Sequence, residues 1–188
     1  MNHGFRKRGR QQTIAGRRPA KKQHERAVID EFLTWLNKHR GTRFKVVAEP
    51  DPPDAIIASV RAKSWIEVAD VFWTTNYARH LYSYATPGER RYPLNPGYYS
   101  QMDQAFAQCF VYVLSTKLKK RSYLPFLKRY GAGYLVIRVQ HPWFDGQTIR
   151  EMRDYWRAEQ PVRNLGCFDA VYVKFSSMNR LAFRKWQV

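Results

Sequence analysis

The stretch PPDAIIASVRAKSWIEVADVF, residues 52–72, holds two apolar runs, and each run carries an acidic residue. Asp54 follows a pair of prolines, and Glu67 lies in the middle of WIEVADVF. Burying a carboxylate costs free energy unless a cation or hydrogen bonds compensate for its charge. The question that decides both fold and function is therefore what Asp54 and Glu67 face.

The two runs predict neighbouring strands over residues 54–60 and 64–72. Because side chains alternate along a strand, Glu67 shares a face with Trp65 and Ala69. If the strands are neighbours, Asp54 and Glu67 converge near one end of the sheet. Two converging carboxylates form a ligand set for a hard divalent cation such as Mg²⁺, which keeps several waters and also binds phosphate.

Helices and strands are expected to alternate along the rest of the chain. The apolar period of residues 22–40 predicts a helix that Gly41 ends, and residues 44–50 predict a first strand. The segment 85–98, rich in Pro and Gly, predicts a loop. Further helices are predicted over residues 100–121, with Ser100 as N-cap, and over 148–160, and further strands over 132–140, 168–176 and in the tail from Arg180 to Val188. We therefore expect one α/β domain over residues 22–188, with a mixed central sheet flanked by helices.

The segment PDAIIAS followed by WIEVA resembles the signature of the PD-(D/E)XK, restriction endonuclease-like nucleases. The expected order of elements over roughly residues 22–140, αβββαβ, is similar to the core of that superfamily. The resemblance implies that Pro53 and Asp54 are the "PD" and that Glu67 is the second acid, both binding Mg²⁺ or Mn²⁺. The chain departs from the signature two residues after Glu67, where Ala69 replaces the lysine.

Some members of that superfamily supply the lysine from the following helix. At 100° per residue, Lys117 falls within about 40° of Phe106, Phe110 and Val113. It therefore lies on the apolar face of its helix, which must pack on the sheet. Lys120 lies about 60° to one side and is the second candidate.

Each candidate residue also has a structural interpretation. Glu25 is centred on the apolar face of the first helix, and the resemblance implies an acid there near the metal, but an acid also suits a first helical turn. Asp54 after two prolines is a common turn residue. Glu67 could pair with a structural arginine, and Lys117 could simply end its helix, where a cation suits the dipole.

Charge is the strongest signal in the composition. Lys and Arg number 33 against 15 Asp and Glu, which gives a net charge of +18 and favours a polyanionic partner, namely nucleic acid. Residues 1–21 precede the first acid, Glu25, and predict a disordered basic arm. The expected nucleic-acid contacts are Arg6, Lys7, Arg8, Arg10, Arg17, Arg18, Lys21, Lys22, Lys119 and Arg121.

Several other classes of protein are not expected. The two cysteines form no CxxC motif or disulfide framework, which favours a cytoplasmic setting. No apolar run approaches the length of a membrane span, and the basic N-terminus lacks the apolar segment of a secretory signal. The five histidines show no zinc-ligand spacing, and no glycine-rich nucleotide motif occurs.

The sequence therefore predicts a metal-dependent nuclease that hydrolyses phosphodiester bonds in DNA. DNA is favoured over RNA only because the superfamily favours it. The main alternative is a catalytically inactive nuclease-fold protein that binds nucleic acid or serves as a complex subunit, and Ala69 favours it. A small basic accessory protein of ribosome or phage assembly is the third. Whether the chain acts alone, as a homodimer or in a larger complex is left open.

Overall fold

The computed structural model describes residues 9–85, 90–93, 101–141, 144–159, 162, 164–177 and 180–187, and it describes side chains except at 9–20, 176, 177 and 180–182. Its elements in chain order are α1 (Gly9–Arg40), β1 (Lys45–Ala48), β2 (Ala55–Ala58), β3 (Lys63–Phe72), α2 (Thr75–Ala85), α3 (Met102–Leu118), the 3₁₀ turn η1 (Arg121–Tyr123), α4 (Leu124–Tyr130), β4 (Gly133–Gln140), α5 (Gly146–Glu159), β5 (Phe168–Ser177) and β6 (Arg180–Trp186). The predicted α/β class is confirmed.

The six described strands form one sheet in the order β1-β2-β3-β4-β5-β6. The strands β1, β2 and β3 pair antiparallel, β4 is parallel to β3, β5 is parallel to β4, and β6 returns antiparallel. The parallel steps each need a crossover, which α3 supplies between β3 and β4 and α5 between β4 and β5. The sheet is therefore mixed, as the alternation of elements predicts.

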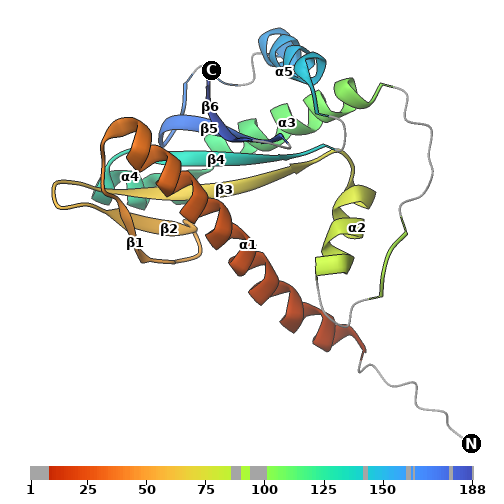
Figure 1. The fold of residues 1–188 in the computed structure, drawn as a ribbon, viewed down its shortest axis with the longest axis horizontal. Helices are drawn as coiled ribbons and strands as arrows, with labels where there is room; N and C mark the ends of the chain where they lie inside the picture. The colour runs from red at the N-terminus through yellow and green to blue at the C-terminus, as the bar shows by residue number, and fades with distance from the viewer. Residues whose placement is uncertain are drawn as a thin grey trace, which may run out of the picture.

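Helix α1 covers one face of the sheet (Figure 1). Its buried residues Ile29, Phe32 and Leu36 repeat at helical spacing and pack with Ile66 and Val68 of β3. Gly41 ends the helix with a φ of 63°, a left-handed conformation that glycine adopts without steric cost. This packing fixes the side of the sheet on which α1 runs.

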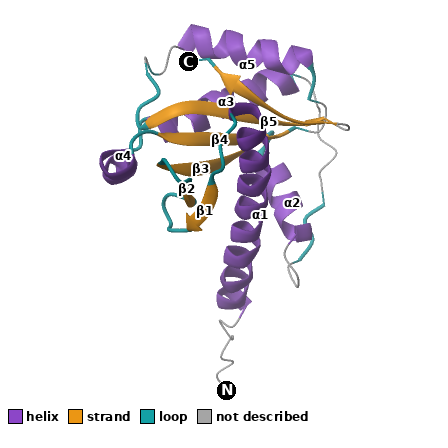
Figure 2. Cartoon of the chain, turned by 60° about the vertical axis from the view of Figure 1, so that its left-hand side comes forward, coloured by secondary structure: helices purple, strands orange, loops and turns teal. Residues whose placement is uncertain are grey.

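Helices α3 and α5 cover the opposite face, as Figures 1 and 2 both show. There Phe106 and Phe110 of α3 are fully buried with Trp65 of β3 and Leu135 of β4. Alternate residues of β3 thus enter two separate cores, one beneath α1 and one beneath α3. Glu67 belongs to the α3 side because it shares a face with Trp65.

Strand β2 is much shorter than its neighbour β3. Register pairs run only from Ala55↔Ile66 to Ala58↔Lys63, so β3 continues past the point where β2 begins. Beyond that point, the backbone N–H of Val68 donates to a side-chain oxygen, Asp54 Oδ2, at 2.7 Å. The uncovered part of β3 leaves one edge of the sheet open beside Asp54 and Glu67.

Three features of the fold differ from the sequence-based expectations. Helix α1 begins at Gly9, so residues 9–21 of the segment expected to be a disordered arm are helical, while residues 1–8 lie outside the described residues. Helix α2 and the η1–α4 segment were not expected. Ser100, the expected N-cap of α3, lies outside the described residues. In Figures 1 and 2 the N-terminal half of α1 extends beyond the sheet, with α2 beside it.

Candidate active site

A cleft of about 280 Å³ opens at the uncovered edge of β3. The walls come from α1, the β1–β2 connection, β3, α2 and α3. Its lining contains Asp54, Glu67, Lys117, Lys120 and Glu25 together with Lys21, Asp51, Asp70, Ala69 and Tyr82. The structure thus brings into one cleft six of the predicted site residues, from α1, the β1–β2 connection, β3, α3 and the α3–η1 connection.

Asp54 is placed by the start of β2. Its Oδ2 accepts the hydrogen bond from the Val68 N–H. The Asp54 side chain thus takes the place of a backbone partner for β3 just before β2 begins. Burial, and then the negative charge of Glu67, raise the pKa of Asp54 from 3.8 to about 7, against the lowering effect of the Val68 hydrogen bond. The two carboxylates are therefore close enough to repel one another.

Glu67 carries its carboxylate into the α3 side of the sheet. The side chain is 5% exposed, and Lys117 Nζ donates to its Oε1 at 2.5 Å. Its second oxygen, Oε2, is buried and has no hydrogen-bond partner within the described part of the chain. A buried carboxylate oxygen without a partner is costly, so Oε2 has an unused capacity to accept a hydrogen bond or to bind a cation.

Lys117 reaches Glu67 from the apolar face of α3. Val113, one turn earlier, also lines the cleft, while Phe106 and Phe110 are buried beneath the helix. Leu118 is buried beside the end of α3, and Lys119 and Arg121 are exposed. The helix face therefore turns the lysine toward the sheet rather than into solvent.

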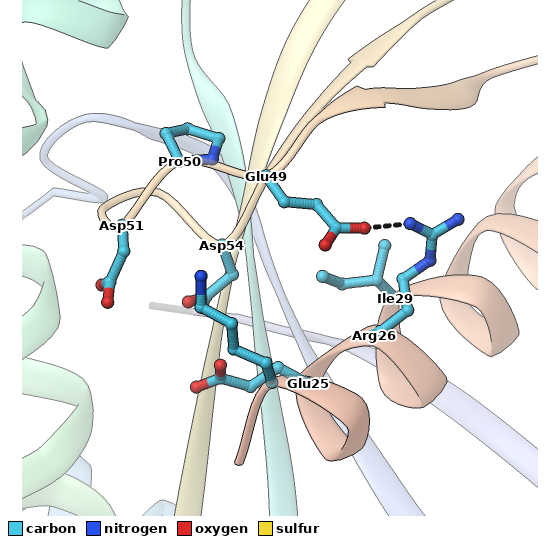
Figure 3. A pocket seen from close by; sticks show the side chains of 8 residues that line it. Glu25, Arg26, Ile29, Glu49, Pro50, Asp51 and Asp54 are labelled. Atoms are coloured by element: carbon cyan, nitrogen blue, oxygen red, sulfur yellow. Dashed lines mark hydrogen bonds and ion pairs between the residues drawn. The ribbon is translucent and has the colours of Figure 1, made fainter. Parts of the chain in front are cut away.

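Glu25 lies on α1, across from the β1–β2 connection. Its Oε1 pairs with Lys21 Nζ at 3.0 Å, and its charge contributes to the raised pKa of Asp54. Figure 3 shows Glu25 and Asp54 beside a small cavity of about 20 Å³, with Arg26 directed to Glu49. A cavity of this size holds about one water molecule.

The remaining basic residues of the sequence-based prediction are distributed along α1. Lys21 lines the cleft, and Lys22 lines the small cavity beside it. Arg10, Arg17 and Arg18 lie on the helical part of the segment, where side chains are not described, and Arg6, Lys7 and Arg8 lie outside the described residues.

Two groups at this site have no sequence signal of their own. On the α1 side of β3, Asp70 bonds Arg138 Nε at 2.8 Å and accepts from the Tyr82 hydroxyl at 3.5 Å. Burial favours a higher pKa for Asp70, but His24 and Arg138 outweigh it and hold the pKa below its ordinary value. Strand alternation could have placed Asp70 opposite Glu67, but not its pairing with Arg138, which comes from a strand 68 positions away.

The second group without a sequence signal is Tyr123, at the end of η1. It is fully buried and packs on Trp65, with ring centroids 5.4 Å apart. Lys120 Nζ lies 4.9 Å from the centroid of the Tyr123 ring, a cation–π contact. Because the η1 turn was not predicted, no pattern in the sequence indicated that Tyr123 lies near Glu67.

The donor set fits a hard divalent cation with few protein ligands. Among the described residues, no group of three or more His, Cys, Asp or Glu side chains is arranged to hold a metal ion. Mg²⁺ commonly uses one or two carboxylates and completes its shell with water and substrate phosphate. The unsatisfied Glu67 Oε2 and the mutual repulsion of Asp54 and Glu67 are the features that such a cation would relieve. Glu25, the third predicted ligand, lines the same cleft, and its carboxylate pairs with Lys21.

Comparisons with known proteins assign no family: the chain matches no protein-family model, no curated protein and no solved structure. Across the described ranges, no helix is both long and apolar enough to cross a membrane. The geometry of the cleft is therefore the basis for assigning a function to this chain.

Proposed function

We propose that this protein is a metal-dependent nuclease that hydrolyses phosphodiester bonds in DNA, with a restriction endonuclease-like core. The observation that carries the proposal is the close arrangement of the buried Glu67 carboxylate, the half-buried Asp54 carboxylate and one ammonium. Asp54 and Glu67 repel one another at the open edge of β3, and Lys117 Nζ lies 2.5 Å from Glu67 Oε1. The element order from α1 to β4 is compatible with the αβββαβ succession of such nucleases, with α2 inserted before α3 and with η1 and α4 inserted after it.

Asp54 and Glu67 are the residues that would hold Mg²⁺ or Mn²⁺ in this cleft. When bound, the cation would lower the pKa of a water and offset negative charge on the phosphate. Lys117 would place its ammonium where negative charge develops on the scissile phosphate, in the role that Ala69 cannot perform. Lys120 and Lys21, both lining the cleft, would hold the flanking phosphates.

The charge of the body supports a polyanionic substrate. Five of the 15 acidic residues line the cleft, while the chain as a whole carries +18. Such a charge attracts a phosphate backbone over distances of about a Debye length, roughly 10 Å at 0.1 M salt. The cation in the cleft would then allow a phosphate to approach carboxylates that otherwise repel it.

A specific observation favours a second candidate, a catalytically inactive member of the same fold that binds nucleic acid. Ala69 stands where the signature has lysine, and Lys117 neutralises Glu67 without any metal ion. If this ion pair is only structural, Asp54 and Glu67 need not act on a substrate. The two candidates differ in whether cleavage depends on these side chains.

A cleavage assay separates the two. Supercoiled DNA, linear DNA and single-stranded RNA are incubated with the protein in Mg²⁺, Mn²⁺ or EDTA, using wild type, Asp54→Asn, Glu67→Gln and Lys117→Met. We expect metal-dependent cutting of DNA that falls by about 10²-fold or more in each variant. Asp154→Asn and Lys128→Met, at exposed positions on α5 and α4, are the matched controls and should cut normally.

Cutting that persists in both Asp54→Asn and Glu67→Gln, or in EDTA, would refute the proposed site. If the wild-type protein cuts nothing yet binds DNA in a salt-dependent manner, the inactive binding protein is the correct assignment. Cutting of RNA alone would keep the site and change the substrate.

A further inference from the structure

Tyr123 is the largest buried polar side chain next to the candidate site that the proposed chemistry does not use. Its side chain is fully buried, yet its hydroxyl has no hydrogen-bond partner among the residues described. The ring is held on two sides, by Trp65 at 5.4 Å and by Phe168 at 5.3 Å between centroids. Such packing leaves the ring little freedom to move, whereas the hydroxyl hydrogen can rotate toward an acceptor.

Glu67 has the complementary unsatisfied group, a hydrogen-bond acceptor. Its Oε1 is bonded to Lys117, and its Oε2 is buried without a partner in the described part of the structure. The two unsatisfied groups lie close together. Trp65, which packs on Tyr123, shares its strand face with Glu67, and Lys120, which rests over the Tyr123 ring, lines the cleft with Glu67. After burial, the negative charge of Glu67 is the largest cause that raises the pKa of the Tyr123 phenol.

We propose that Tyr123 is a positioning residue, whose hydroxyl donates a hydrogen bond to Glu67 and fixes the orientation of that carboxylate in the cleft. The inference deepens the proposed function, and its consequence for cation binding rests on it. A carboxylate held by Lys117 on one oxygen and by Tyr123 on the other cannot turn about its last bond. The remaining lone pairs of the carboxylate therefore point in fixed directions. Metal-binding side chains in proteins are commonly oriented by hydrogen bonds in this way.

The protonation state of Tyr123 supports the role of donor. Burial, followed by the negative charge of Glu67, raises the pKa of the Tyr123 phenol above its ordinary value. The phenol therefore keeps its proton throughout the pH range in which a nuclease works. Its ring also has a second use, since Lys120 rests over it. The informative substitution is thus Tyr123→Phe, which keeps the ring and removes only the hydroxyl.

The hydrogen bond is tested without any metal or substrate, by a double-mutant cycle in urea unfolding. The variants are Tyr123→Phe, Glu67→Gln and the pair, with Tyr134→Phe as the matched control. Tyr134 is also a buried tyrosine, but it packs in the α1-side core with Phe32 and Tyr172. We expect the urea midpoint of the Tyr123/Glu67 double variant to differ from the additive value by about 0.5 M or more, and the Tyr134/Glu67 pair to be additive. Additivity at Tyr123 would overturn the proposal.

The consequence for the site is tested by Mn²⁺ binding, measured as the electron paramagnetic resonance signal of free Mn²⁺. We expect Tyr123→Phe to raise the Mn²⁺ dissociation constant about 10-fold, with Tyr134→Phe unchanged. Equal Mn²⁺ affinity in Tyr123→Phe and wild type would overturn the positioning role. A wild-type protein that binds no Mn²⁺ would instead count against the proposed function, and the unfolding cycle distinguishes that failure from a failure of the hydrogen bond.

Discussion

Glu67 is a buried carboxylate, so its charge must be compensated by groups within the protein. Its carboxylate is almost entirely removed from water and relies on Lys117 for compensation. Breaking a buried ion pair by deleting one member is much worse than deleting both, because the survivor keeps an uncompensated charge. The stability of the protein should therefore depend on this pair whether or not the protein is an enzyme.

The substitution Lys117→Met tests that dependence. We expect it to lower the free energy of unfolding by about 2–4 kcal/mol, because Glu67 is left charged and buried. The double variant Lys117→Met/Glu67→Gln should recover most of the loss. Urea unfolding near pH 7 measures both, and Lys128→Met, on the exposed side of α4, should change stability by less than about 0.5 kcal/mol. An equally large loss in the double variant would mean that packing, not charge, is responsible.

Asp54 links stability to pH with a defined sign. Its pKa is raised from 3.8 to about 7 in the folded protein, so the folded state holds a proton that the unfolded state has already released. The stabilisation from this group is complete below about pH 4 and is lost as pH rises toward 7. Relative to Asp54→Asn, which does not titrate, the wild-type protein should become progressively less stable across that interval.

Thermal melts at pH 5 and pH 8, without metal, measure the effect as the difference in Tm between wild type and Asp54→Asn. We expect Asp54→Asn to gain stability relative to wild type at pH 8, and Mn²⁺ at pH 8 to raise the Tm of wild type but not of the variant. Asp154→Asn, at an exposed position on α5, is the control. A Tm difference that does not vary with pH would contradict the buried environment of Asp54.

At the scale of elements, the pairing of β3 with β4 depends on a close approach at Gly133. A Cβ at this position would lie 2.3 Å from the Trp65 ring, whose Nε1 donates to Gly131 O at 2.9 Å. The Trp65 indole therefore packs against the start of β4. Trp65 lies two residues before Glu67, on the same face of β3. Trp65 and Gly133 together set how closely the two strands can approach beside the cleft.

We expect Gly133→Ala to destabilise the protein by about 1–3 kcal/mol, because the Trp65 ring has no room to accept a methyl group. Chemical unfolding gives the free-energy change directly. Gly146→Ala is the control at the start of α5, where the nearest atom to an added Cβ is the far end of Arg150 at 3.7 Å. Equal stability of the two alanine variants would show that the β3–β4 approach is less tight than the structure has it.

The charges of the whole molecule are unevenly distributed. The acids of the candidate site line the cleft, while basic residues outnumber acids in the chain and in the N-terminal half of α1. Residues 1–20 contain six basic residues and no acid, so without them the net charge falls from +18 to +12 (18 − 6). Lys21 is excluded from this count, because it pairs with Glu25 at the cleft.

Deleting residues 1–20 should weaken DNA binding and reduce its salt dependence without removing cleavage. Each lost phosphate contact lowers the slope of log K against log salt by about 0.9, so the six charges set an upper limit of about 5. Fluorescence anisotropy at several salt concentrations measures the slope. A deletion variant with the wild-type slope would place the phosphate contacts on the folded body instead.

Local patterns in the sequence were enough to define the α/β class and most of the elements. Alternation along residues 64–72 predicted that Glu67 shares a face with Trp65, and the helical period predicted that Lys117 lies on the buried face of its helix. Both statements concern residues within one element, where backbone geometry alone sets direction. They are the part of the site that needs no knowledge of tertiary structure.

Only the tertiary structure decided how those directions meet. The Asp54–Val68 hydrogen bond depends on where β2 begins, the Asp70–Arg138 pair on the β3–β4 register, and the place of Tyr123 on an unpredicted 3₁₀ turn. The extension of α1 to Gly9 was also missed, because a segment of few apolar residues carries no period to reveal a helix. The first three share one physical reason. Periodicity reports how a residue is oriented within its own element, whereas the partner of a buried polar group is set by contacts between separate elements.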